Sequence, residues 1–158
     1  MDTLTLAHKT LLTGLLKADV NFLLIGGYAV NYHGYPRYTN DMDIWLKPDE
    51  ENKIKFAKFL RQIDISPESI NHILTLNFTM TNAFHLGQNE TRIDFLTKIS
   101  GVTFDEAEKE KVFLTLDNKN IPVIHFDHLI KNKILSARPK DLADVDELQK
   151  VNMFKHKK

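Results

Sequence analysis

The chain has 158 residues, which matches one domain that buries most of the surface its unfolded chain exposes. Lysine plus arginine and aspartate plus glutamate both total 21, so no overall charge attracts a polynucleotide, and no DNA partner is expected. The absence of cysteine excludes disulfides and thiolate metal sites. Residues 1–9 lack the basic-then-apolar order of a signal peptide, and no apolar run approaches the length of a membrane span. We therefore expect a cytoplasmic protein with no membrane partner.

Hydrophobic spacing predicts the first three elements. Leucines at positions 4, 11, 12, 15 and 16 recur at helical spacing, which predicts a helix over residues 2–18. The short apolar run 22–25 ends at Gly26-Gly27, so it predicts a buried strand that enters a tight turn. Residues 28–32 are expected to continue as a helix, which Pro36 breaks.

A second strand and a second long helix are predicted next. The strand runs from Asp41 to Lys47, and the sequence 48–51, Pro-Asp-Glu-Glu, is a strong helix start. Trp45 and Phe56 are expected in the hydrophobic core. The face of the new helix that packs on the core is expected to carry Ile54, Phe56, Ala57, Phe59, Leu60 and Ile63.

The rest of the chain alternates strand and helix signals. Asp127 is expected to cap a helix that runs to Ala137, where Pro139 ends it, and another helix starts near Asp141. No repeat or linker divides the chain, so we predict one mixed α/β or α+β domain over residues 1–158, with two C-terminal helices. The elements predicted between the two long helical regions are a short helix within 65–74, a hairpin of strands 83–86 and 91–96 joined by 87–90, a helical turn at 104–111, and strands 112–116 and 121–126 around a turn at 117–120.

Two aspartates at alternate positions carry the strongest chemical signal. Asp41 and Asp43 share one face of the predicted strand because side chains alternate across a strand. Burying two adjacent carboxylates is costly unless one is protonated or a cation neutralises both. Mg²⁺ prefers oxygen ligands and is held by one or two carboxylates together with substrate phosphates, which a glycine turn such as Gly26-Gly27 admits. The pattern indicates metal-dependent phosphoryl or nucleotidyl chemistry.

The order and spacing of these residues resemble the signature of the polymerase-beta-type nucleotidyltransferase superfamily. The signature has an apolar residue, a glycine pair, a spacer of about a dozen residues, and an Asp-x-Asp flanked by apolar residues. Here the glycines are Gly26 and Gly27, the spacer is 28–40, and the aspartates are Asp41 and Asp43. Small members with this general appearance include enzymes that modify antibiotics and enzymes of abortive-infection or toxin-antitoxin systems. The resemblance implies a nucleotidyltransferase-like domain with a mixed sheet flanked by helices.

The resemblance also implies a third carboxylate on a later strand, directed at the same metals. Asp94 lies between Ile93 and Phe95 inside a predicted strand, where an aspartate conflicts with the β-propensity of its neighbours. The alternative interpretation is an aspartate that faces solvent on a half-exposed strand. With Asp41, Asp43 and Asp94 converged, two Mg²⁺ ions would activate a hydroxyl and stabilise the leaving pyrophosphate of a nucleoside triphosphate.

A helical lysine near the C-terminus is the expected triphosphate ligand. Residues 127–148 are similar to the tail of many small nucleotidyltransferases, in which an apolar pair precedes a helical lysine; here the pair is Leu129-Ile130 and the lysine is Lys133. The implied role of Lys133 is to hold phosphate as a point charge. In the alternative interpretation, Arg138, Asp141 and Asp144 form a structural network that orients Lys133. Arg37 and Thr39, just before the aspartates, are candidates for touching phosphate or acceptor, or are ordinary surface-loop residues.

Three hypotheses about function follow. The first is an Mg²⁺-dependent enzyme of the EC 2.7.7 type that moves a nucleoside monophosphate from ATP or another triphosphate to a hydroxyl of a small molecule, RNA or protein. The second is a nucleotide-binding module without turnover, or one subunit of a two-component, toxin-antitoxin-like complex. In that case a homodimer or a small helical partner protein supplies the acceptor-binding surface. The third is a structural domain with surface aspartates, against which the intact order of the motifs argues.

Overall fold

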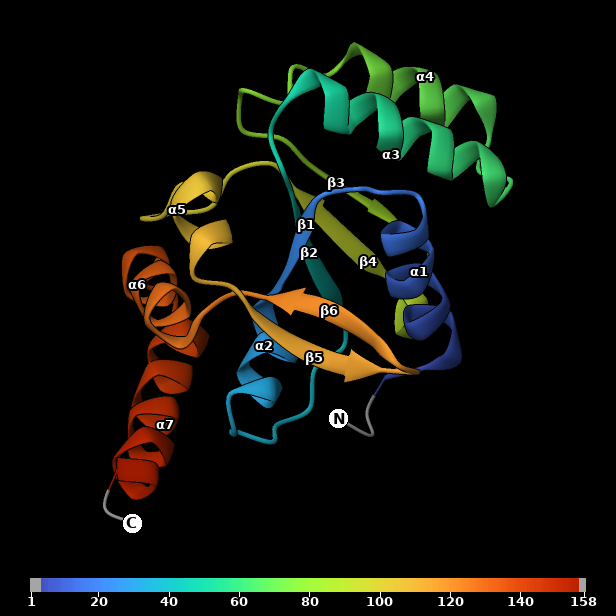
Figure 1. The fold of residues 1–158 in the computed structure, drawn as a ribbon. Coiled ribbons are helices and arrows are strands. Elements are labelled where there is room, and N and C mark those ends of the chain that lie inside the picture. Colours follow the sequence, from blue (N-terminus) through green and yellow to red (C-terminus); the bar gives the residue numbers. More distant parts are fainter. Residues whose placement is uncertain (1–3, 157–158) are drawn as a thin grey trace.

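The computed structural model describes residues 4–156, so residues 2 and 3 of the predicted first helix lie outside the described part. The strands form one mixed six-stranded sheet in the order β3-β4-β2-β1-β6-β5, and helices flank it (Figure 1). This is a single α/β domain, as predicted. The helices are α1 (Leu6–Lys17), α2 (Gly26–Tyr32), α3 (Glu50–Gln62), α4 (Pro67–Thr75), α5 (Phe104–Lys109), α6 (Phe126–Ser136) and α7 (Pro139–His156). The strands are β1 (Phe22–Ile25), β2 (Met42–Leu46), β3 (Ala83–Leu86), β4 (Ile93–Leu96), β5 (Val112–Leu116) and β6 (Lys119–Val123), with a short 3-10 helix at Asn89–Thr91.

Strands β1, β2 and β4 lie next to one another in the sheet, and both parallel and antiparallel pairing occurs among them. β1 pairs antiparallel with β2, and β2 pairs parallel with β4. A parallel partner needs a long crossover, which α3 and α4 provide between β2 and the β3–β4 hairpin (Figure 1). The hairpin predicted at 83–96 is confirmed, since β3 and β4 pair antiparallel. β2 and β4 therefore lie side by side although α3, α4 and β3 separate them in the chain.

Local signals place most element boundaries correctly. Asp49 caps α3 through its side chain, which accepts a hydrogen bond from the backbone N–H of Asn52 at 2.7 Å. The strand predicted at 121–126 is instead Lys119–Val123, because Asp117 and Asn118 both adopt positive φ and close a two-residue hairpin turn. The cap predicted at Asp127 is wrong: His125 is the N-cap of α6, and its side chain accepts from the backbone N–H of Asp127.

The buried face of α3 differs from the predicted one. Trp45 and Phe56 are fully buried, as expected, but Ile54 and Ile63 are exposed. Asn52 is buried instead, and it is hydrogen-bonded to the backbone of Asn21 and Lys47. The ammonium of Lys53 is also buried and donates to the carbonyl oxygens of residues 74 and 76 at the end of α4. These polar residues can be buried because backbone groups outside α3, and for Lys53 also the carboxylate of Glu50, satisfy them.

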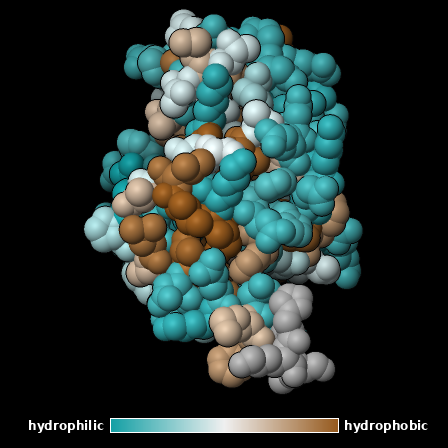
Figure 2. All heavy atoms as spheres, turned by 90° about the vertical axis from the view of Figure 1, so that its left-hand side faces the viewer, coloured by the Kyte–Doolittle hydropathy of each residue, from teal (hydrophilic) through white to brown (hydrophobic). Residues whose placement is uncertain are grey.

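The C-terminal helices pack as a pair on one side of the sheet. α6 contacts both α7 and α2, whereas α1 packs against α3 and β6 (Figure 1). The outward face of this side carries a group of apolar side chains (Figure 2), and the large hydrophobic residues exposed on α6 and α7 are Ile134, Leu135, Leu142, Met153 and Phe154. Within residues 4–156, no helix has the length and apolar character needed to cross a membrane.

Candidate active site

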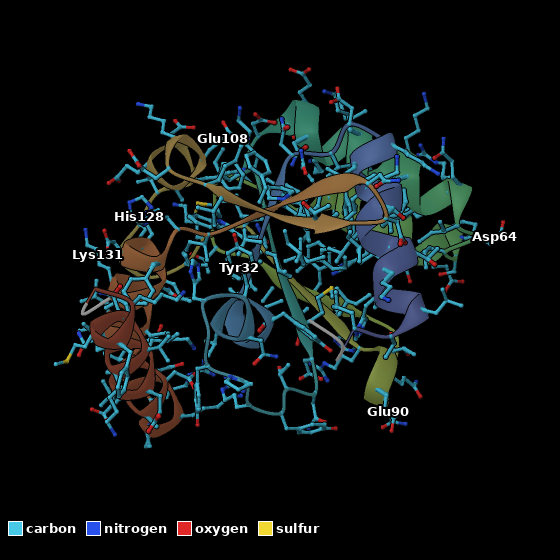
Figure 3. All side chains as sticks on the ribbon, turned by 60° about the horizontal axis from the view of Figure 1, so that its bottom comes forward. Tyr32, Asp64, Glu90, Glu108, His128 and Lys131 are labelled. Carbon is cyan, nitrogen blue, oxygen red and sulfur yellow. The ribbon has the colours of Figure 1, made fainter. Side chains whose placement is uncertain are left out.

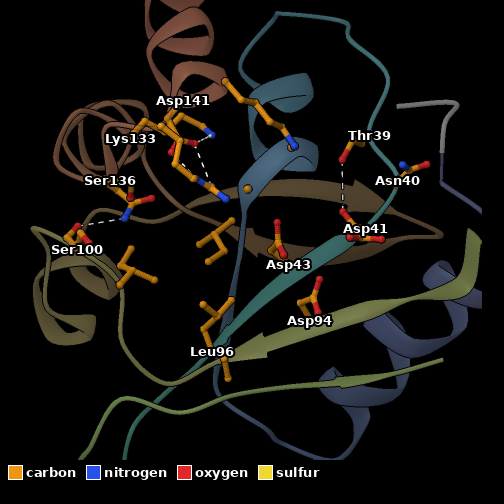
Figure 4. A pocket seen from close by; sticks show the side chains of 18 of the residues that line it. Thr39, Asn40, Asp41, Asp43, Asp94, Leu96, Ser100, Lys133, Ser136 and Asp141 are labelled. Atoms are coloured by element: carbon orange, nitrogen blue, oxygen red, sulfur yellow. Dashed lines mark hydrogen bonds and ion pairs between the residues drawn. The ribbon is translucent and has the colours of Figure 1, made fainter. Parts of the chain in front are cut away.

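An open cleft with a volume of about 820 Å³ lies where α6 and α7 face the edge formed by β1, β2 and β4 (Figure 4). Its walls come from the β1–α2 junction, the loop before β2, strands β2 to β4, and the α6–α7 corner. The candidate residues chosen from the sequence all line it: Gly26, Gly27, Arg37, Thr39, Asp41, Asp43, Asp94 and Lys133. The fold therefore brings into one cleft residues that span more than a hundred positions of the chain.

Asp43 and Asp94 are direct neighbours in the sheet. The parallel register of β2 and β4 pairs Asp43 with Asp94, so both side chains leave the sheet on the same face, and Figure 4 shows the two carboxyl groups pointing the same way. Asp41 lies just before β2 and projects to one side of this pair (Figure 4). The structure thus forms a close pair of carboxylates with a third at the rim of the same cleft.

Burial and the neighbouring carboxylates make the ionised form of Asp43 unfavourable. Burial raises the pKa of Asp43 to about 6, and repulsion from Asp94 and Asp41 adds to the shift, while the positive charges of Lys140 and Lys133 oppose it. Arg92 partly neutralises the charge of Asp94, since Arg92 Nε and Nη2 both donate hydrogen bonds to Asp94 Oδ1, at 3.2 and 3.1 Å. No side chain in the described part of the chain donates a hydrogen bond to Asp43. A buried carboxylate without a hydrogen-bond donor beside a second carboxylate is a group that a cation would stabilise.

The shifted pKa of Asp43 predicts a pH-dependent stability in the absence of divalent cations. The folded protein holds the proton of Asp43 more tightly than the unfolded chain, whose carboxyl has the ordinary value of 3.8. The ionised carboxylate therefore destabilises the fold above about pH 6, and the penalty fades as the pH falls towards 3.8. Asp43→Asn is expected to be more stable than the unmodified protein at pH 7.5, by up to about 3 kcal/mol.

Urea unfolding of both proteins in the presence of a chelator checks this expectation. The difference in the free energy of unfolding should narrow steadily between pH 6 and pH 4. A difference that stays constant over this range would mean that the carboxyl of Asp43 has an ordinary pKa.

The glycine pair allows two cleft residues to pack against the start of α2. Gly26 has φ +66°, a conformation that other residues rarely adopt, and a methyl group added there would overlap the carboxyl group of Asp43. A methyl group on Gly27 would overlap the hydroxyl of Thr39. The side chains that approach the backbone closely at these glycines are thus those of Asp43 and Thr39. The helix α2 begins at Gly26, two residues before the predicted start at Tyr28.

Lys133 is buried at the centre of an ion network. Its ammonium lies 3.3 Å from Asp141 Oδ1 and 3.0 Å from Asp144 Oδ2, and all three side chains are at most 5% exposed. Asp144 also holds Arg37, and Asp141 also holds Arg138. Burial is the largest single effect and by itself would raise the pKa of both carboxyls. The hydrogen bonds and positive charges of Arg138 and Lys133 at Asp141, and of Arg37 and Lys133 at Asp144, together outweigh it and hold both pKa values below their usual range. The network predicted as the alternative for Lys133 is present, and Lys133 lines the cleft as well.

Solved structures that superpose on this chain include proteins described as nucleotidyltransferases or nucleotidyltransferase-like. A protein from Thermotoga maritima described as a nucleotidyltransferase superposes with a TM-score of 0.58 at 14% identity, over 95% of this chain and 91% of that one. The lincosamide antibiotic adenylyltransferase LnuA, with lincomycin bound, gives 0.57 at 15% identity over 92% and 96%. An antigenic nucleotidyltransferase-like protein from Paracoccidioides brasiliensis gives 0.52 at 16% identity over 89% and 72%. This chain has the nucleotidyltransferase fold. No family model matches its sequence, and none of the curated proteins is similar to it.

The nucleotidyltransferase fold raises the question of whether this cleft suits Mg²⁺. Within residues 4–156, no three histidine, aspartate or glutamate side chains are gathered closely enough to enclose an ion, and Asp41 projects to one side of the Asp43–Asp94 pair (Figure 4). Mg²⁺ needs only one or two carboxylates when substrate phosphates and water complete its shell. Asp43 accepts no hydrogen bond from the described side chains, and Arg92 leaves Asp94 Oδ2 free. The oxygen donors of this pair therefore fit a hard divalent cation.

Several residues of the cleft were not identified from the sequence. Lys98 and Lys140 line it, and within the described residues neither lies within ion-pair distance of a carboxylate. Arg92 was missed as the partner of Asp94. Spacing is a signal for Arg92, which stands two residues before Asp94 in the sequence. Lys98 follows β4 beyond a bend at Thr97, so strand alternation does not point to it. Lys140 carries no comparable local signal, because the corner between α6 and α7 places it.

Proposed function

We propose that this protein transfers a nucleoside monophosphate from a nucleoside triphosphate to a hydroxyl group, in an Mg²⁺-dependent reaction. The observation that supports this proposal is the position of the Asp43–Asp94 pair in the same cleft as the cationic side chains of Arg37, Lys133 and Arg138. Carboxylates that suit a cation and cations that suit phosphate are the two components that nucleotidyl transfer requires. The shared fold with nucleotidyltransferases, including one that acts on an antibiotic, supports the same reaction class.

In the proposed mechanism, the side chains of this chain bind, orient and move one proton. Asp43 and Asp94 would hold Mg²⁺, which when bound would polarise the α-phosphate and offset its negative charge. Lys133 and Arg138 bind the β- and γ-phosphates. The acceptor oxygen forms a bond to the α-phosphorus while the bond from that phosphorus to the bridging oxygen breaks. Asp94 takes the proton of the hydroxyl through the oxygen that does not hold Mg²⁺, and pyrophosphate leaves with its charge balanced by the lysine and the arginine.

A small hydroxylated molecule is the acceptor that the charges of the cleft favour. Arg37, Lys133 and Arg138 are each tied to a buried carboxylate, and the chain as a whole is neutral. A polynucleotide acceptor needs several cations to follow its backbone in addition to those that bind the triphosphate. Within the described part of the cleft, only Lys98 and Lys140 are free of carboxylate partners. We therefore propose a small-molecule acceptor rather than RNA.

Two measurements test the proposed function. Calorimetric titration with ATP, GTP, CTP and UTP is expected to show binding that Mg²⁺ strengthens. Incubation with α-labelled triphosphates and a panel of hydroxyl compounds, with RNA as a parallel acceptor, is expected to release pyrophosphate and label a small molecule. Binding without transfer to any acceptor would favour a nucleotide-binding module. No binding of any triphosphate would reject both functions.

A further inference from the structure

Two buried carboxylates on α7 face the cations of the cleft. Asp141 and Asp144 are 1% and 2% exposed, and each is shared between two cationic side chains. They lie one turn apart on the helix, so both point to the same side of α7. We propose that Asp144 and Asp141 are positioning residues, which aim Arg37, Lys133 and Arg138 at the triphosphate; this inference rests on the proposed function.

Asp144 fixes Arg37 by a two-pronged contact. Arg37 Nε donates to Asp144 Oδ1 at 2.7 Å, and Arg37 Nη2 donates to Asp144 Oδ2 at 2.9 Å. This geometry holds the plane of the guanidinium as well as its position. The remaining hydrogen bond from the head group, from Nη1 to the carbonyl of Tyr38 at 3.0 Å, fixes the opposite side. The second hydrogens of Nη1 and Nη2 stay available, and Arg37 lines the cleft.

The same carboxylates fix the other two cations. Lys133 donates to Asp141 and contacts Asp144, which leaves its third ammonium hydrogen available. Arg138 donates from Nε at 2.7 Å and from Nη2 at 3.1 Å to Asp141, while its side chain is 70% exposed and lines the cleft. Each cation thus has one part bound to a buried carboxylate and another part left for an anionic ligand.

The network also connects two distant parts of the fold. Arg37 lies in the loop between α2 and β2, which leads directly to Asp41 and Asp43, whereas Asp144 lies on α7. Lys133 lies on α6, so Asp144 ties this loop to both C-terminal helices. The contact between Arg37 and Asp144 therefore also helps to set the distance between the Asp43–Asp94 pair and the cations at the α6–α7 corner, Lys133 and Arg138.

For the substitution Asp144→Asn, the change in charge and the loss of positioning predict opposite effects on the binding of a polyphosphate. The three cations and two carboxylates of the network have a net charge of one positive unit. Asp144→Asn makes the cleft more positive by one unit, so charge alone would strengthen the binding of a polyphosphate. If Asp144 positions Arg37 and Lys133, the same change weakens binding, because both cations lose the group that aims them.

The experiment is a calorimetric titration of the folded protein with Mg²⁺ and inorganic tripolyphosphate, repeated with the nucleoside triphosphate that binds best. We expect Asp144→Asn to weaken binding by about tenfold or more. Asp144→Glu keeps the charge and is expected to recover most of the affinity. The matched control is Asp146→Asn on the same helix, since Asp146 is exposed, Lys150 is its one ion-pair partner among the described residues, and the charge change is identical. This control is expected to leave binding unchanged.

The outcomes separate the two proposals. Binding by Asp144→Asn that equals or exceeds that of the unmodified protein overturns the positioning role and leaves the proposed function intact. Failure of the unmodified protein to bind any triphosphate overturns both. If circular dichroism shows that Asp144→Asn does not fold, Asp141→Asn carries the same prediction, because Arg138 and Lys133 lose the carboxylate that aims them. The contacts of Asp144 with Arg37 and Lys133 stay in place in this variant and support the fold. Unchanged or tighter binding by that variant likewise overturns the inference.

Discussion

Asp43→Asn is expected to abolish nucleotidyl transfer, with a loss in kcat of about a thousandfold or more, equivalent to about 4 kcal/mol in the barrier. Asparagine has nearly the shape of aspartate but lacks its charge, so the pair with Asp94 can no longer hold Mg²⁺ against the triphosphate. The measurement is single-turnover transfer of a labelled nucleotide at saturating triphosphate and Mg²⁺.

This loss of activity can be separated from a loss of structure. Because burial and like charges strain the ionised carboxyl of Asp43, the same variant is expected to be more stable than the unmodified protein at neutral pH without divalent cations. Asp146→Asn, which removes an exposed carboxylate of α7, serves as the control with normal activity. Retention of full activity by Asp43→Asn would remove Asp43 from the catalytic centre.

Lys133→Met is expected to lower the stability of the fold by about 3 kcal/mol, as breaking a buried ion pair does. Methionine fills much of the volume of the lysine stem but lacks the ammonium that lies between Asp141 and Asp144. Asp141 keeps Arg138 as a partner and Asp144 keeps Arg37. The loss of stability is therefore expected at the lower end of the range for a broken buried ion pair. The second expected effect is the loss of most of the affinity for tripolyphosphate. Urea unfolding and calorimetric titration measure the two effects.

Lys131→Met is the matched control for this substitution. Lys131 lies two residues earlier on α6, is exposed (Figure 3), and does not line the cleft. The same chemical change at this position is expected to alter neither the free energy of unfolding nor tripolyphosphate affinity by a measurable amount. Equal losses in the two variants would show that a general effect of positive charge on α6, rather than the buried position of Lys133, is responsible.

Much of the fold could be predicted because its signals are local. The strand 22–25 and the start of α3 depend on an apolar run, a glycine turn and a capping aspartate, all within a few residues of the elements they define. The buried face of α3 could not be predicted in the same way. Lys53 is buried because carbonyls at the end of α4 accept its hydrogens, and those partners lie more than 20 residues away.

The candidate site also has features that depend on local sequence and features that depend on distant contacts. The sequence by itself determined that Asp41 and Asp43 stand at alternate positions, that a glycine pair precedes them, and that oxygen and nitrogen atoms rather than thiolates are the metal donors available. These properties depend only on residue type and spacing. The sequence also offered Asp94 and Lys133 as candidates through resemblance, without showing which groups they contact.

Only the tertiary structure decided which charges meet. The parallel register of β2 and β4 places Asp94 beside Asp43 and leaves Asp41 at the rim, and pairing register between distant strands is not written in either strand alone. The contact between Arg37 and Asp144 joins residues 107 positions apart. Coulomb interactions and hydrogen bonds depend on distance in space, so the ion network around Lys133, and with it the direction in which each cation points, exists only once α6, α7 and the loop before β2 have packed together.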